Sequence, residues 1–165
     1  RIAAGRTGST RLLGRAPVMA ISALDSANIR CALAHGLVPL IYGDVAFDQQ
    51  LGGTILSTET LFFHLAQELR PSRILLLGNA PGVLDSGGNV IERITPATYS
   101  EVKAFLHGSG YTDVTGGMAD KVEQMIHLVE CIPSLKIRIM TGQRRGNLLH
   151  HLLEDEFPVC TSIEA

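Results

Sequence analysis

Apolar residues in this chain form short continuous runs that alternate with stretches of helical spacing. The clearest runs cover residues 37–42 (LVPLIY), 73–77 (RILLL) and 136–140 (KIRIM). A continuous apolar run of four to eight residues next to glycine or proline is typical of a strand buried on both faces of a sheet. We therefore expect strands at these three places, with shorter strands at residues 16–21 and 157–163.

Helical spacing is clearest behind residues 116–117. Apolar residues recur there at i, i+3, i+4 and i+7, which predicts an amphipathic helix that ends before Pro133. The residues are Val122, Met125, Ile126 and Val129. Other helices are expected around Ile29 and Leu33 up to Gly36, from Ser57 to Leu69 with Leu61, Phe62 and Leu65 inward, from Pro96 to Leu106, and from Gly146 or Asn147 to Leu153.

The alternation of strands and helices decides the fold class. It predicts an α/β protein with a mainly parallel sheet, covered by helices on both faces, that binds its ligands at the carboxyl ends of the strands. Residues 78–88 interrupt this order with two turns around Val83-Leu84, which predicts a β-hairpin or an arm over a ligand. With 165 residues, 45% of them hydrophobic, the chain can bury one full core.

Composition excludes several classes of partner. The net charge of -2 and the absence of a Lys/Arg run argue against nucleic acid binding. No apolar stretch approaches the roughly 18 residues of a membrane span, and the three cysteines form no Cys-x-x-Cys pair. We expect a soluble, cytoplasmic protein. Because the chain starts at Arg1 in a glycine-punctuated stretch, we also expect further sequence upstream.

Three glycine-marked loops follow expected strands or precede an expected helix. They are Gly43-Asp44, Gly78–Gly82 and Thr115-Gly116-Gly117. Paired glycines let backbone N–H groups approach an anion, and the helix that follows the third loop directs the positive end of its dipole there. Lys121 in its first turns opposes that dipole, which favours an anionic partner. A solvated lysine behind an ordinary glycine turn is the alternative.

Four stretches carry a resemblance to a known family. They are GLVPLIYGD at residues 36–44, GTILSTETL at 53–61, the apolar strand with its Gly-x-x-x-Gly-Val turn, and DVTGGMADKV at 113–122. Together they resemble the amino-acid-kinase superfamily, and most of all its isopentenyl phosphate kinase branch. The most specific part is Asp-Val-Thr-Gly-Gly-Met with a lysine four residues after the second glycine.

The resemblance implies a three-layer α/β/α sandwich, usually a homodimer, that transfers the γ-phosphoryl group of ATP, bound with Mg²⁺, to a small phosphorylated acceptor, with isopentenyl phosphate as the first candidate. It places Thr115, Gly116, Gly117 and Lys121 at the ATP phosphates, with Lys121 as the catalytic charge, and Asn79 beside the nucleoside. Ser57, Thr58 and Thr60 would lie near the acceptor. Residues 1–35 would be a remnant of the acceptor-binding part, and 36–165 the nucleotide-binding domain.

The chain also departs from the family pattern. The turn at residues 78–84 lacks the two carboxylates of the family, and Glu59 stands where an aspartate is usual. Two further motifs of the family are absent from the sequence: a Lys-Leu-Gly-Gly-Ser strand end, and the glycine-rich Ser-Phe-Gly-His loop that binds the acceptor phosphate. Catalysis in the family depends on both. A second interpretation is therefore a non-catalytic nucleotide-binding or regulatory protein of the same fold.

A few polar residues remain as weaker candidates. Asp44 could orient a group near the acceptor, or it could belong to an ordinary turn. His64 is expected to pack within its helix or at the surface, and His150-His151 to lie on a helix surface near its C-terminus. Arg144 and Arg145 follow a strand end, where they could reach a nucleotide or simply occupy a solvated loop.

Overall fold

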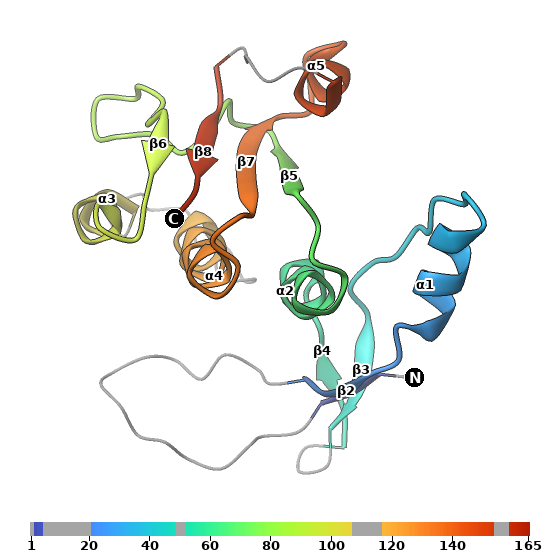
Figure 1. Ribbon diagram of the computed structural model, residues 1–165. Helices are drawn as coiled ribbons and strands as arrows, with labels where there is room; N and C mark the ends of the chain where they lie inside the picture. The colour runs from blue at the N-terminus through green and yellow to red at the C-terminus, as the bar shows by residue number, and fades with distance from the viewer. Residues whose placement is uncertain (1, 5–20, 49–51, 107–116, 154–158) are drawn as a thin grey trace. The chain divides into compact units, whose positions relative to one another are not determined.

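The computed structural model of the chain describes residues 2–4, 21–48, 52–106, 117–153 and 159–165 (Figure 1). Its contacts divide the chain into two compact units, residues 1–68 and 69–165. Each unit has a four-stranded sheet and helices of its own. The α/β class expected from the alternation of strands and helices is confirmed.

The sheet of the first unit has the strand order β2-β1-β3-β4. β1 (Ile2–Ala4) pairs antiparallel with β2 (Ile21–Leu24) and parallel with β3 (Val45–Asp48), which in turn pairs antiparallel with β4 (Thr54–Ile55). The strand expected from residue 16 is thus described from Ile21 onwards, because residues 16–20 lie outside the described residues.

Two helices complete the first unit. α1 (Ala27–Ala34) is followed by Gly36, whose φ of 72° lies in the left-handed region that glycine adopts at little cost. α2 (Thr58–Leu69) begins one residue after the expected Ser57 and ends at the expected Leu69. It buries Leu61 and Leu65, together with Phe63 rather than Phe62. Ser26 and Arg30 both bind the Glu68 carboxylate, which ties the start of α1 to the end of α2.

The strand expected at residues 37–42 is absent. These residues form an irregular connection between α1 and β3, and Val38, Leu40 and Tyr42 are 94%, 92% and 70% exposed. A strand that is apolar throughout needs neighbours on both edges and both faces, and no strand of the described residues pairs with this segment. The prediction was wrong because the pattern carries no information on whether such neighbours are present.

The sheet of the second unit has the strand order β5-β7-β8-β6. β5 (Arg73–Gly78) and β7 (Lys136–Thr141) pair parallel over six positions, β7 pairs antiparallel with β8 (Thr161–Ile163), and β8 pairs parallel with β6 (Arg93–Ile94). The strands expected at 73–77 and 136–140 are confirmed. Leu84 and Val90 form an antiparallel bridge, so the expected hairpin is present in minimal form.

The core of the second unit lies under α4 (Gly117–Cys131), which packs on β7 and β8 with α3 (Tyr99–Leu106) beside it (Figure 1). All four residues of the predicted stripe on α4 are buried, and Val122, Met125 and Val129 are fully so. α3 starts three residues later than expected, because Pro96 belongs to a turn in which Thr95 and Thr98 exchange hydrogen bonds.

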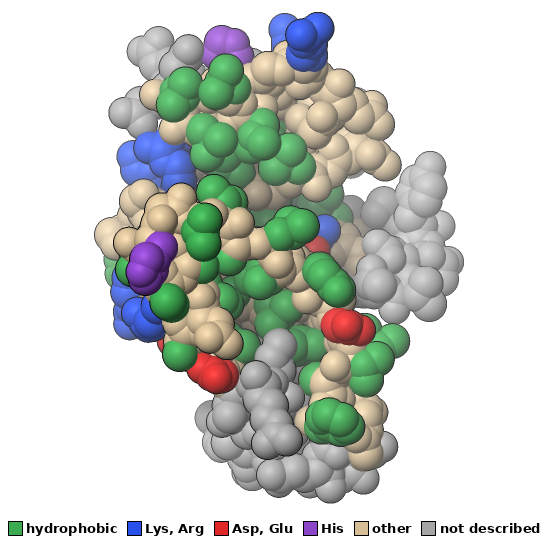
Figure 2. All heavy atoms as spheres, turned by 90° about the vertical axis from the view of Figure 1, so that its right-hand side faces the viewer, with side chains coloured by type: hydrophobic (Ala, Val, Ile, Leu, Met, Phe, Trp, Pro, Cys, Tyr) green, Lys and Arg blue, Asp and Glu red, His purple; other side chains and the backbone are tan. Residues whose placement is uncertain are grey.

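α5 (Asn147–Leu153) has the opposite burial pattern to an ordinary surface helix, in which the apolar residues are buried and the polar residues are exposed. It buries its polar residues Asn147 and His151, while its leucines are between 43% and 75% exposed. In the upper part of Figure 2, where Figure 1 places α5, hydrophobic side chains (green) gather next to histidine (purple) and cationic (blue) side chains. In the described parts of the chain, no helix combines the length and apolarity needed to cross a bilayer.

Candidate functional site

The residues expected near an acceptor lie together in the first unit, where α2 begins. The Gly43 N–H donates to the Thr58 hydroxyl oxygen at 3.1 Å, and the Leu56 N–H donates to the carbonyl oxygen of Asp44 at 2.8 Å. These bonds join the loop before β3 to the loop before α2. The Asp44 side chain is exposed and accepts the Val45 N–H at 2.7 Å, so it sits at the edge of this cluster.

Ser57 caps the N-terminus of α2. Its hydroxyl oxygen accepts the Thr60 N–H at 3.1 Å and lies 2.9 Å from the Thr60 hydroxyl, which satisfies one of the free N–H groups at the helix start. Thr60 is buried and its hydroxyl is engaged with Ser57, so its visible role is structural. Among the described residues, the Thr58 hydroxyl accepts from Gly43 and donates to no group, so its proton is available for a ligand.

Gly43 has a role that the sequence interpretation missed. A Cβ atom at this position would lie 2.4 Å from the Leu56 carbonyl oxygen and 2.8 Å from the Thr58 nitrogen. Only glycine lets the two loops approach this closely. A glycine directly after an apolar run is the signal that could have indicated the close approach, although such a glycine also occurs in ordinary turns.

The residue expected beside the nucleoside, Asn79, follows β5 at the carboxyl edge of the second sheet. Gln143 donates to the Asn79 side-chain oxygen at 3.3 Å, and the Thr141 hydroxyl donates to the Asn79 carbonyl oxygen at 3.4 Å. Since β5 and β7 are parallel and Gly78 is paired with Thr141, the loops after both strands meet at one edge. Arg144 and Arg145 follow in the second loop, and both are exposed.

The expected phosphate loop is described only from its second glycine. Thr115 and Gly116 lie outside the described residues. Gly117 is the first residue of α4 and has a φ of 63°, while Lys121 is half-buried on the flank of the helix beside the fully buried Val122. The helix has 15 residues, so its N-terminus carries the full partial positive charge of a helix dipole. A common role of Lys121 and Asn79 in ATP binding stays a prediction.

Among the described residues, two histidines, His64 and His151, have a lowered pKa. Burial lowers the pKa of His64 below its ordinary value, opposed by the negative charge of Glu68, and the His64 ring meets Phe63 edge-on. Burial also lowers the pKa of His151, as do the neighbouring charges of Arg138 and His150. His150 is exposed as expected, but the expectation for His151 was wrong, because it is fully buried.

Arg138 is a buried residue that the pattern did not single out. It is 3% exposed in the middle of β7 and donates to the His151 carbonyl oxygen at 3.2 Å, where Arg73 donates as well. Both guanidinium groups therefore hold the C-terminal end of α5, where a positive charge is favourable. A lone arginine inside an apolar run was the available signal. The arrangement is structural.

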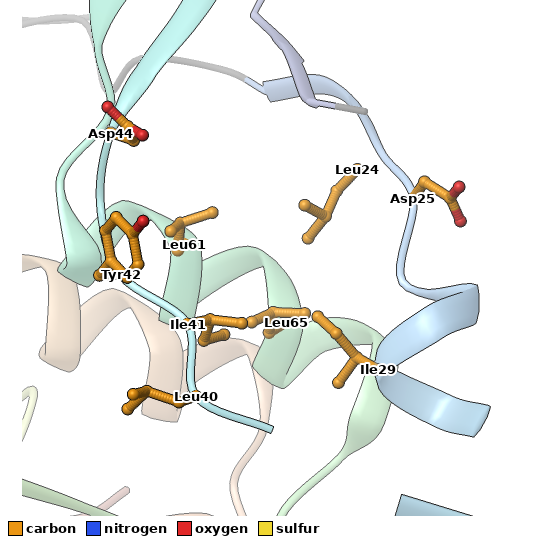
Figure 3. Close-up of a pocket in the computed structure, with 9 residues that line it drawn as sticks. All are labelled: Leu24, Asp25, Ile29, Leu40, Ile41, Tyr42, Asp44, Leu61 and Leu65. Carbon is orange, nitrogen blue, oxygen red and sulfur yellow. The ribbon is translucent and has the colours of Figure 1, made fainter. Parts of the chain in front are cut away.

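An apolar cavity of about 310 Å³ lies in the first unit. Figure 3 shows Leu24, Ile29, Ile41, Leu61 and Leu65 directed toward its centre, with Asp25 and Asp44 at the margin. Asp44 is the only expected site residue among those that line it.

The match to a family model covers residues 5–140, and the family is described as the amino acid kinase family. The isopentenyl phosphate kinase of Haloferax volcanii is 41% identical over 105 residues, which are 64% of this chain and 42% of that protein. The acetylglutamate kinase of Nautilia profundicola is 28% identical over 137 residues, 82% of this chain and 46% of that protein.

A solved structure of an isopentenyl phosphate kinase superimposes with a TM-score of 0.67 at 25% identity and covers 87% of this chain and 52% of that one. The chain spans about half the length of the curated relatives it matches. Because the family model extends over most of the sequence and the fold agrees with it, the chain belongs to the amino acid kinase family.

Proposed function

We propose that this chain provides the nucleotide-binding part of an ATP-dependent kinase that phosphorylates a small phosphorylated acceptor, with isopentenyl phosphate as the first candidate. The observation that carries the proposal is the start of α4. A long helix begins there at a glycine with positive φ, Lys121 follows within its first turns, and the segment lies inside the stretch matched by the family.

This helix start fits the phosphates of ATP. Gly117 has no Cβ, so the backbone N–H groups at the helix start can approach phosphate oxygens closely. The dipole of α4 favours negative charge at the same end. Lys121 would neutralise the charge that develops on the β/γ-bridging oxygen during transfer. Thr115 and Gly116 complete this proposed set.

Mg²⁺ would be bound together with the ATP phosphates and would neutralise further charge there. In the ranges that the structure describes, no group of three or more His, Cys, Asp and Glu side chains is arranged to hold a metal ion. We therefore assign no protein ligand to Mg²⁺. The contribution of the chain is to hold and orient the nucleotide, because phosphoryl transfer depends on positioning and charge neutralisation rather than on a covalent intermediate.

The acceptor would be positioned by the cluster of Asp44, Ser57 and Thr58 at the start of α2, with Thr60 supporting Ser57. A second helix N-terminus, with a hydroxyl that can donate at Thr58, is suited to an anionic acceptor group. Relatives named isopentenyl phosphate kinase support isopentenyl phosphate, whereas relatives named acetylglutamate kinase support a carboxylate acceptor. We also propose that residues 1–35 are a remnant of the acceptor-binding part and that residues 36–165 form the nucleotide-binding domain. As the family resemblance implies, the protein would be a homodimer.

The second candidate function is nucleotide binding without turnover. One observation favours it. The loop after β5 carries Asn79 where carboxylates are usual for the family, and the oxygen atoms of Asn79 accept hydrogen bonds from Gln143 and Thr141. Such a loop could hold a nucleoside without the usual polar contacts.

One assay separates the two functions. The chain is incubated with ATP labelled at the γ-phosphate and, in separate reactions, with isopentenyl phosphate, N-acetylglutamate, uridylate, carbamate or fosfomycin, while calorimetry measures ADP binding. The kinase proposal expects labelled product with isopentenyl phosphate. ADP binding without transfer to any acceptor would support the binding function, and the absence of both would contradict each proposal.

Lys121→Ala tests the role of α4 directly. Loss of a charge-assisted contact to phosphate should weaken ATP binding by about 2 kcal/mol, which corresponds to a ~30-fold rise in the dissociation constant. Lys136→Ala is the matched control, because Lys136 is an exposed lysine at the start of β7, the edge of the sheet opposite the nucleotide loops. If both substitutions changed the dissociation constant of ATP equally, Lys121 would be an ordinary solvated lysine at the surface.

A further inference from the structure

Two amide side chains meet at the carboxyl edge of the second sheet, on the loops that follow the neighbouring strands β5 and β7 (Figure 1). The Gln143 side chain donates to the Asn79 side-chain oxygen at 3.3 Å, and both residues are exposed. An amide group has two N–H donors and a carbonyl acceptor. Among the described residues, no other group binds the Asn79 side-chain nitrogen or the Gln143 side-chain oxygen. The pair therefore keeps donors and acceptors available for a ligand.

The available groups of this amide pair suit a base better than a phosphate. Phosphate oxygens only accept hydrogen bonds and bind most strongly to cationic donors. Adenine offers a donor at its 6-amino group beside an acceptor at N7, and asparagine and glutamine are the side chains that match both. If both amides were turned over, the same kinds of group would remain available. The pair is therefore suited to the nucleoside of ATP rather than to its phosphates.

Thr141 joins the two loops that carry the amide pair. Its hydroxyl donates to the Asn79 carbonyl oxygen at 3.4 Å and accepts the Gln143 N–H at 3.2 Å. The Gly142 N–H donates to the Gly78 carbonyl oxygen at 2.9 Å, which continues the pairing of β5 with β7. These bonds fix the position of one loop relative to the other before a ligand arrives, and such preorganisation lowers the entropic cost of binding.

Asn147 closes the loop that carries Gln143. It is 4% exposed at the start of α5, and its side-chain nitrogen donates to the Thr141 carbonyl oxygen at 2.8 Å. Its backbone N–H donates to the Arg144 carbonyl oxygen at 3.1 Å, and Gly146 turns the chain with a φ of 84°. The loop of residues 142–146 is therefore held by a hydrogen bond across its base. Because Asn147 is buried, it can affect a ligand only through this loop.

We propose that Gln143 contacts the nucleoside together with Asn79, and that Asn147 is the positioning residue that holds Gln143 in place. The amide pair would stand in for the carboxylates that the turn at residues 78–84 lacks. The inference rests on the nucleotide site of the proposed function. It does not depend on phosphoryl transfer, because the binding of ADP is sufficient to test it.

Calorimetric titration with ADP tests the contact of Gln143. Gln143→Leu removes the amide at an exposed position, so the chain should fold normally and bind ADP about five- to tenfold more weakly. Inorganic triphosphate, used as a competitor of ADP, has no nucleoside and should bind the altered and unaltered chains equally. Ser134→Leu is the matched control. Ser134 is exposed in the turn before β7, at the opposite edge of the sheet, and its substitution should leave both affinities unchanged.

A double-mutant cycle tests the role of Asn147. Asn147→Ala removes the bond to Thr141 and should weaken ADP binding at least about threefold. Because Asn147 acts through Gln143, adding Asn147→Ala to Gln143→Leu should cost less than about a further twofold, whereas independent effects would multiply. Amide hydrogen exchange at residues 142–143 should be at least about tenfold faster in Asn147→Ala. If circular dichroism shows that Asn147→Ala does not fold, Asn147→Ser, which keeps a hydroxyl donor, takes its place in the cycle.

The results separate this inference from the proposed function. Equal ADP affinities of Gln143→Leu and Ser134→Leu, or an equal loss of ADP and triphosphate binding in Gln143→Leu, would overturn the nucleoside contact. Multiplying effects of the Gln143 and Asn147 substitutions would overturn the positioning role. If ADP binds as expected and no acceptor is phosphorylated, the kinase proposal fails and the inference stands. A chain that binds neither ADP nor triphosphate would contradict both.

Discussion

Residues 37–42 and 73–77 carry the same sequence signal and have opposite fates. Both are short apolar runs that end at a glycine. The second run forms β5, paired along its whole length with β7, whereas the first remains irregular and largely exposed. The difference lies in the neighbours, because β7 supplies a parallel edge to β5 and no described strand does so for residues 37–42. An apolar run therefore predicts where a strand can form, and a partner decides whether it does.

The largest effect that we expect from this contrast is a difference in unfolding free energy between substitutions of two leucines. Leu128 of α4 is fully buried in the core of the second unit, and Leu40 is 92% exposed. Leu128→Ala should lower the free energy of unfolding by about 3 kcal/mol, since the substitution leaves a cavity, whereas Leu40→Ala should change it by less than about 0.5 kcal/mol. Urea denaturation followed by circular dichroism measures both values. Similar losses would mean that residues 37–42 are packed as firmly as the core.

Much of the second unit could be predicted from its sequence because its signals are local and its partners are present. The stripe from Val122 to Val129 on α4 has a period of 3.6 and is buried as expected. The runs at 73–77 and 136–140 pair with each other, so each supplies the neighbour that the other requires. Here the local pattern and the tertiary contacts agree.

The sequence was less informative where one residue acts through a distant contact. The His151 carbonyl oxygen at the end of α5 accepts hydrogen bonds from Arg138 on β7 and from Arg73 on β5, which is 78 residues away in the chain. The role of Gly43 depends on the approach of residues 56–58. The resemblance placed Ser57 and Thr58 near the acceptor, and Asp44 was a weaker candidate for the same place. Their loops are joined by hydrogen bonds. Their function stays a prediction.

A second test compares the glycines that end the two apolar runs. At Gly43 an added Cβ would meet the Leu56 carbonyl oxygen at 2.4 Å, whereas at Gly78 nothing lies within 4 Å. Gly43→Ala should destabilise the chain by about 1–3 kcal/mol, because the backbone of residues 56–58 must shift. Gly78→Ala should have little effect. Equal unfolding free energies of the two variants would show that the loops before β3 and α2 do not meet as closely as the geometry indicates.

The smallest expected effects concern His64 in the first unit and His151 in the second. Burial lowers the pKa of both below the ordinary value of 6.5. Each unfolded histidine therefore binds a proton at a pH where the folded one does not, so both contribute stability above about pH 6.5 that is lost as the pH falls below it. Glu68 opposes the shift at His64, whereas Arg138 and His150 reinforce it at His151.

The pH dependence of unfolding should separate these two histidines. The free energy of unfolding, measured by urea denaturation, should fall between pH 7.5 and pH 5.5. The substitution His151→Gln should reduce this fall more than His64→Gln does. The reason is that positive charges next to His151 disfavour its protonation, whereas the charge next to His64 is negative. The slopes are compared rather than the absolute values, since glutamine also changes the packing. An unchanged slope in His151→Gln would mean that His151 can be protonated without loss of stability, and that the end of α5 opens to solvent more readily than its burial indicates.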